Sequence, residues 1–183
     1  FWVLFGTANQ LLAALTLFGL VRRTLRGPVL REKWAARADA VAFAGALLWA
    51  VHPLQTESVT CVIQRTESLM GLFYLFTLYA FARGAEAASQ RGRILWGALS
   101  VLACALGMAT KEVMITAPVI ALLYDRTFIS GSFRGVARQR WLYYGMFALW
   151  ALLFHLMQGN PMRGGTTGYD TVTWWQYLLT QCE

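Results

Sequence analysis

Charged side chains are scarce in this sequence. Asp, Glu, Lys and Arg together make up 14% of its 183 residues, whereas soluble domains carry about 25%. Hydrophobic residues account for 57%, and a soluble core of this size cannot bury so much apolar surface. The composition therefore excludes a typical soluble enzyme and a disordered chain. The class that remains is a protein that crosses a membrane several times.

Cysteine and the short motifs of catalysis are also few or missing. The three cysteines, Cys61, Cys104 and Cys182, lie far apart and show neither CxxC nor histidine-rich spacing, which excludes a disulfide framework and a zinc site. There is no glycine-rich phosphate loop and no nucleophile elbow. We therefore expect no metal and no cofactor.

The sequence contains several long apolar runs. They predict an all-α bundle of six spanning helices, with a short helix at the outer membrane surface in the more polar residues 55–67. The predicted spans are residues 1–21, 38–54, 68–82, 94–110, 113–124 and 141–158. Asn9 and Gln10 interrupt the first run, so one face of that helix should contact protein rather than lipid.

The basic residues are distributed unevenly between the two sides of this predicted bundle. Loops 22–38, 83–93 and 125–140 carry thirteen of the sixteen Lys and Arg residues. The positive-inside rule places these loops in the cytoplasm, where they can also contact anionic lipids. The net charge of +7 is therefore a topology signal. Because no nucleic-acid-reading motif accompanies it, nucleic acid is not expected as a partner.

A second group of ionisable residues is predicted at the opposite, non-cytoplasmic side. Its members are His52, Glu57, Arg65, Glu67, Lys111 and Glu112. Ionisable groups at membrane depth mark either function or pairing. In the functional interpretation, Arg65 and Lys111 bind the phosphate of a lipid-linked substrate, while His52 and the glutamates shape the pocket. In the structural interpretation, the same residues form salt bridges between helices.

Three separated blocks of sequence resemble one known family. They are an HP-x-x-TE-x-V block, an R-x-(acid)-x-L block, and a KE pair opening a helix that ends at YD. The matching residues are His52, Pro53, Thr56, Glu57 and Val59, then Arg65, Glu67 and Leu69, then Lys111, Glu112, Tyr124 and Asp125. These blocks are similar to the membrane domain of the transmembrane and tetratricopeptide-repeat O-mannosyltransferases, and most of all to its bacterial relatives.

The resemblance implies a glycosyltransferase of the GT-C type. Such an enzyme moves a sugar from a polyprenyl- or dolichyl-phosphate carrier to a hydroxyl group of a protein on the non-cytoplasmic side. It also implies that the catalytic acid lies in a loop upstream of Phe1 and that tetratricopeptide repeats follow the membrane domain. The sequence is therefore expected to be an internal piece, inactive by itself, with no catalytic base assigned within it.

Other functions stay open at this stage. A non-enzymatic membrane scaffold or lipid-binding subunit would use the outer charges for structure alone. A transporter would need a polar stripe through mid-membrane, which the sequence lacks, and we rank it last. A bacterial inner membrane suits the resemblance better than the endoplasmic reticulum does. Protein acceptors and membrane lipids are the expected partners.

Overall fold

The structure is a computed structural model that describes residues 2–55, 65–131, 145–146, 148–149 and 152. The chain divides into two units, Phe1–Trp150 and Ala151–Glu183. Of the second unit only residue 152 is described, so the fold is that of the first. Every regular element among the described residues is helical and none is a strand. For these residues the all-α prediction is confirmed.

Six α-helices and several shorter turns make up the described part of the first unit. The α-helices are α1 (Trp2–Arg26), α2 (Arg31–Trp34), α3 (Ala38–Ala50), α5 (Arg65–Glu86), α6 (Gln90–Thr110) and α7 (Ala117–Tyr124). The 3-10 helices are η1 (Ala35–Arg37), η2 (Pro53–Gln55) and η3 (Glu112–Thr116), and η4 (Asp125–Ile129) is a π-helical turn.

Two of these helices are long and apolar enough to cross a membrane by length and composition. They are α6 and the segment Val3–Arg26 of α1. The count of six spans stays a prediction, because most of residues 141–158 and residues 56–64 of the predicted surface helix lie outside the described residues.

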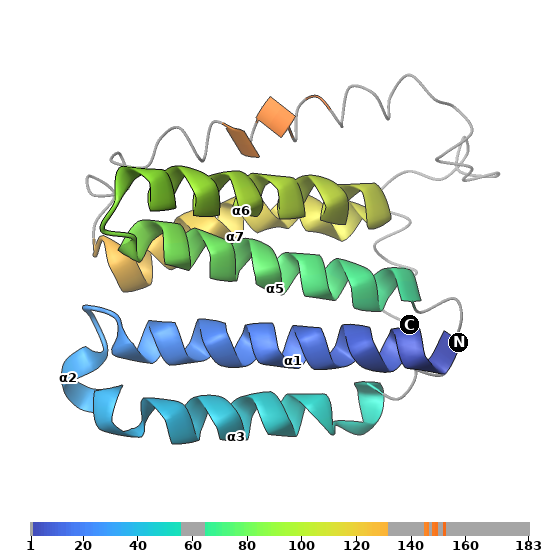
Figure 1. The fold of residues 1–183 in the computed structure, drawn as a ribbon, viewed down its shortest axis with the longest axis horizontal. Coiled ribbons are helices and arrows are strands. Elements are labelled where there is room, and N and C mark those ends of the chain that lie inside the picture. The colour runs from blue at the N-terminus through green and yellow to red at the C-terminus, as the bar shows by residue number, and fades with distance from the viewer. Residues whose placement is uncertain (1, 56–64, 132–144, 147, 150–151, 153–183) are drawn as a thin grey trace, which may run out of the picture. The chain divides into compact units, whose positions relative to one another are not determined.

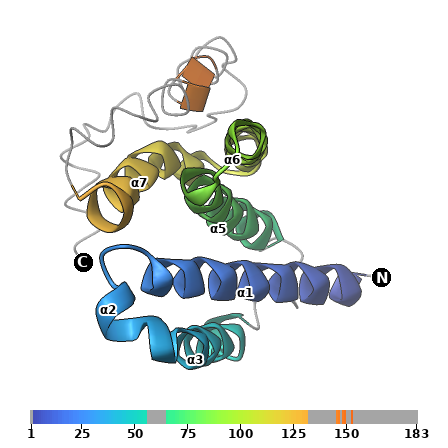
Figure 2. The ribbon, with the colours of Figure 1, turned by 60° about the vertical axis from the view of Figure 1, so that its left-hand side comes forward.

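The helices follow one another in space in a simple order. Helix α1 packs between α3 and α5, and both α6 and α7 contact the far side of α5 (Figure 1). Figure 2 shows the same order after a rotation. Helices α1 and α5 end near the start of α6 (Figure 1). The arginines at these three helix ends therefore lie at one end of the bundle, which we call the basic end.

Small side chains lie between the helices, and large apolar side chains lie outside them. The buried residues of α3 are alanines at every fourth position, Ala38, Ala42 and Ala46. Those of α6 are Gly97, Ser100, Ala103, Cys104 and Gly107. By contrast, Leu4 and Leu48 are 73% and 69% exposed. This arrangement is typical of helices that associate in lipid, where small residues let backbones approach closely.

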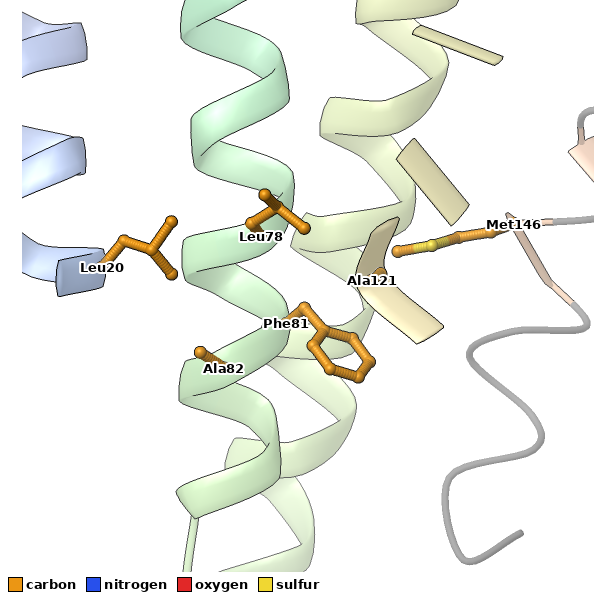
Figure 3. Close-up of a cluster of buried hydrophobic side chains, with 6 residues drawn as sticks. All are labelled: Leu20, Leu78, Phe81, Ala82, Ala121 and Met146. Atoms are coloured by element: carbon orange, nitrogen blue, oxygen red, sulfur yellow. The ribbon is translucent and has the colours of Figure 1, made fainter. Parts of the chain in front are cut away.

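A cluster of buried hydrophobic side chains joins α1, α5 and α7. It contains Leu20 of α1, Leu78, Phe81 and Ala82 of α5, Ala121 of α7, and Met146. Figure 3 shows the Met146 side chain extending toward Ala121. Because three helices contribute to it, this cluster fixes α5 between α1 and α7.

Candidate functional site

The candidate site lies where α5 begins and α6 ends. Lys111 is the first residue after α6, with extended backbone (φ −157°, ψ 146°), and its N–H caps the helix on the Gly107 carbonyl at 3.0 Å. Glu67 lies in the first turn of α5, where a carboxylate interacts favourably with the helix dipole. The Lys111 ammonium donates a hydrogen bond to Glu67 Oε1. The pair therefore links two helix ends that are 44 positions apart.

This ion pair is open to its surroundings. The side chains of Lys111 and Glu67 are 37% and 45% exposed. A lysine ammonium has three donors, on a flexible stem. The described contacts use one of them, so an incoming anion can bind Lys111 while Glu67 stays in place.

Polar residues of α1 lie beside the start of α5. The Asn9 amide donates to Ser68 Oγ, and Ser68 directly follows Glu67 in the sequence. Asn9 and Gln10 are 4% and 8% exposed, so they face protein, as the sequence predicts. Gln10 Nε2 is buried and has no hydrogen-bond partner among the described contacts.

The segment after Lys111 is also held against α5. The Tyr74 hydroxyl lies 3.0 Å from Thr116 Oγ1. Thr116 Oγ1 in turn donates to the Val113 carbonyl at 2.9 Å. Because the threonine proton is used in that bond, Tyr74 is the donor to Thr116. This bond holds η3 against α5. Lys111 lies between α6 and η3, so its position is fixed on both its N-terminal and its C-terminal side.

The structure describes only some of the six predicted site residues. It brings Glu67 and Lys111 into contact. His52 is exposed in the turn after α3, where its N–H donates to Trp49 O and its carbonyl accepts from Gln55 N. Arg65 opens α5 and Glu112 opens η3, but their side chains are outside the description. Glu57 lies outside the described residues.

Several contacts at this site are not evident from the sequence. Ser68, Tyr74 and Thr116 are ordinary helix residues there, and only Asn9 stands out as a polar break in an apolar run. Among the residues that the structure describes, no group of three or more His, Cys, Asp or Glu side chains gathers as a metal ion would require. The chemistry that the described residues offer at this site is a half-exposed ammonium group held by a carboxylate.

The fold and this pair define a class of protein. It is an all-helical chain with small residues between helices and large apolar residues on the outside, with a charged pair where two helices meet at one end. These are the features of a helical membrane protein. Residues 3–157 match the family described as dolichyl-phosphate-mannose-protein mannosyltransferase. The chain belongs to this family.

Curated relatives agree with this assignment. The chain is 33% identical over 112 residues to protein O-mannosyl-transferase TMTC4 of Homo sapiens, which covers 60% of the chain and 14% of the relative. It is 36% identical over 126 residues to protein O-mannosyl-transferase Tmtc2 of Drosophila melanogaster, covering 66% of the chain and 12% of the relative. The chain thus spans a small part of these relatives' length. No solved structure matches it.

Proposed function

We propose that this chain is part of a membrane glycosyltransferase that moves mannose from a dolichyl- or polyprenyl-phosphate carrier to a hydroxyl group of a protein. Family membership supports the reaction class. The single structural observation that supports the site is the half-exposed Lys111–Glu67 pair at the junction of α5 and α6. In this proposal Lys111 binds the phosphate end of the carrier, and Glu67 orients Lys111.

Charge explains what Lys111 does in this reaction. When the sugar is transferred, negative charge develops on the departing carrier phosphate, and a nearby cation stabilises it. The Lys111 ammonium supplies that cation, and Glu67 orients it before the carrier arrives. Arg65 belongs to the same first turn of α5 as Glu67, and we propose it as a second phosphate ligand.

The remaining predicted residues support this pocket in the proposal. His52, Glu57 and Glu112 shape it and contact the acceptor or the carrier. No residue of this chain is assigned as the catalytic base. In this proposal the basic end faces the cytoplasm and Lys111 faces the other side of the membrane, and the positive-inside rule supports this orientation. The membrane itself is the bacterial inner membrane in this proposal.

A charge-swap experiment tests the role of Lys111. Lys111→Ala and Glu67→Gln are each compared with the double variant Lys111→Glu/Glu67→Lys, made in the protein expressed from its complete gene. Abundance in the membrane reports folding, and transfer from a polyprenyl-phosphate sugar reports activity. We expect Lys111→Ala to abolish transfer at normal abundance, and the swap to restore the ion pair without restoring transfer.

A matched control separates this result from a general loss of salt bridges. Asp39→Asn breaks the contacts of Asp39 with Arg22 and Arg26 at the basic end and should leave transfer unchanged. If the Lys111–Glu67 swap restored both abundance and activity, the pair would be structural and the scaffold function would replace the proposal. If Lys111→Ala kept normal transfer, phosphate binding by Lys111 would be disproved.

A further inference from the structure

Three arginines lie at the basic end, one each on α1, α5 and α6. Arg23 is near the end of α1, Arg83 is near the end of α5, and Arg93 is in the first turns of α6. The backbones of the last two are close: a Cβ built at Gly84, next to Arg83, would lie 3.7 Å from the Arg93 carbonyl oxygen. We call Arg23, Arg83 and Arg93 the arginine cluster.

Aromatic rings, rather than carboxylates, hold much of this cluster. The Arg83 guanidinium lies 4.6 Å from the centre of the Trp96 ring and donates to the Tyr79 hydroxyl at 3.1 Å. The Arg23 guanidinium lies 5.6 Å from the centre of the Tyr79 ring. Tyr79 and Trp96 meet edge to face, with centroids 6.2 Å apart. Stacking orients a guanidinium and leaves most of its five N–H donors available.

The charges in the cluster are not balanced within the described part of the chain. Glu86 is the described acid that contacts it, and its carboxylate binds Arg23. Among the described residues, Arg83 has no acidic partner and the buried Arg93 Nε has no hydrogen-bond partner. A buried, unpaired guanidinium N–H costs free energy, so the cluster has the properties of a site that a further anion completes.

The surroundings of the cluster indicate which anion this is. The α5–α6 turn joins two apolar helices, so the cluster lies where such helices leave the hydrocarbon layer. Tyr and Trp rings favour that depth, and basic pockets between membrane helices bind lipid phosphates. We propose that Arg83 and Arg93 bind the phosphate of an anionic phospholipid head group, with Arg23, Tyr79 and Trp96 as the walls of the site.

This proposal uses the end of the bundle opposite to Lys111 and does not depend on sugar transfer. It depends only on the chain being embedded in a membrane. The two proposals can therefore fail separately, because one is measured by lipid retention and the other by transfer.

The test measures which lipid stays with the purified protein. The protein, expressed from its complete gene, is exchanged into nanodiscs made from equal amounts of phosphatidylglycerol and phosphatidylcholine, then washed in detergent, and retained lipids are quantified by mass spectrometry. We expect phosphatidylglycerol to be enriched. In Arg83→Gln/Arg93→Gln the enrichment should fall by about fivefold for each arginine removed.

Matched variants keep the result interpretable. Arg31→Gln/Arg37→Gln removes the same charge from exposed positions outside the cluster and should retain the enrichment. If the Arg83/Arg93 glutamine variant fails to fold, Arg83→Lys/Arg93→Lys keeps the charge but loses the planar fork that binds phosphate at two points. That lysine variant should also show reduced enrichment.

Three outcomes would overturn the proposal. The first is equal retention of the two lipids by the unmodified protein. The second is an enrichment in the cluster variants that equals that of the unmodified protein. The third is a loss of enrichment in Arg31→Gln/Arg37→Gln equal to that in the cluster variants, which would assign the enrichment to general surface charge instead of the cluster.

Discussion

The hydroxyl groups of Thr24 and Tyr124 lie 2.7 Å apart, although 100 positions separate them in the sequence. Thr24 Oγ1 also lies 2.8 Å from the Leu20 carbonyl, to which it donates. Since its only proton is used there, Tyr124 donates to Thr24. This bond joins the end of α1 to the end of α7 across the described bundle.

Removing the Tyr124 hydroxyl should weaken the bundle by a measurable amount. Hydrogen bonds between membrane helices contribute about 0.6 kcal/mol on average. We expect Tyr124→Phe and Thr24→Val each to lower the free energy of unfolding, with a coupling of about 0.5–1 kcal/mol in the double-mutant cycle. Unfolding in mixed micelles with increasing SDS measures this. Strict additivity of the two substitutions would show that the bond makes no contribution.

Gly19 permits the Tyr79 ring to approach α1. A Cβ at position 19 would lie 2.8 Å from Tyr79 Cε2, whereas a Cβ at Gly45 in α3 would meet nothing within 4 Å. Gly45→Ala should therefore stabilise its helix by about 0.5–1 kcal/mol. Gly19→Ala gains the same helix propensity but forces the ring to move, at a cost of about 1–3 kcal/mol.

The comparison of these two glycine variants is the informative measurement. We expect a lower thermal stability in detergent for Gly19→Ala than for Gly45→Ala, and a loss of phosphatidylglycerol enrichment in Gly19→Ala alone, because Tyr79 supports Arg23 and Arg83. Equal stability gains in both variants would mean that the α1–α5 contact at Gly19 is looser than described.

Asn9 and Gln10 are neighbours with opposite expected effects. Asn9 is paired with Ser68, so Asn9→Leu removes the donor to a partly buried hydroxyl and should cost about 1 kcal/mol. Gln10 Nε2 is buried and has no partner in the described part of the chain, so Gln10→Met, which conserves volume, should be neutral or stabilising by about 1 kcal/mol. The same SDS unfolding assay measures both, and a strong destabilisation by Gln10→Met would contradict the absence of a partner.

Adjacent positions of α6 provide a further matched pair. Ala103 is 3% exposed and Leu102 is 55% exposed. Ala103→Leu adds volume where α6 meets its neighbours and should cost about 1–3 kcal/mol or block folding. Leu102→Ala removes a side chain from the outer surface and should change the unfolding free energy by less. The reverse order of stabilities would mean that α6 presents its other face to the bundle.

Sequence patterns predicted the helices better than their ends. Within the apolar run predicted at residues 1–21, residues 2–21 are helical, but α1 continues to Arg26, because arginine is a good helix former and is favoured near a C-terminus. Residues 83–93 have the composition of a loop, yet α5 continues to Glu86 and α6 starts at Gln90. Ser89 makes this short turn possible, since its Oγ accepts the Gly92 N–H at 3.1 Å.

Proline and distant contacts set the limits of such prediction. Pro118 lies within the predicted span 113–124, and the structure places it in the first turn of α7, after the 3-10 helix η3. Proline fits a first turn because the backbone N–H that it lacks would have no partner within the helix there.

Charge alone suggested that Glu67 and Lys111 converge. The pairs Asn9–Ser68 and Thr24–Tyr124 depend on how helices pack, which no local pattern encodes.

The length of α6 has a consequence for the lipid around the protein. Its 21 residues rise about 32 Å, close to the 30 Å or so of a hydrocarbon layer. Arg91 and Lys111, at its two ends, are therefore separated by about one membrane thickness. In a thinner bilayer α6 would have to tilt to keep its apolar length covered. If the proposed transfer takes place at Lys111, its rate should depend on the acyl-chain length of the surrounding lipid, because tilting α6 moves Lys111 relative to the head-group layer.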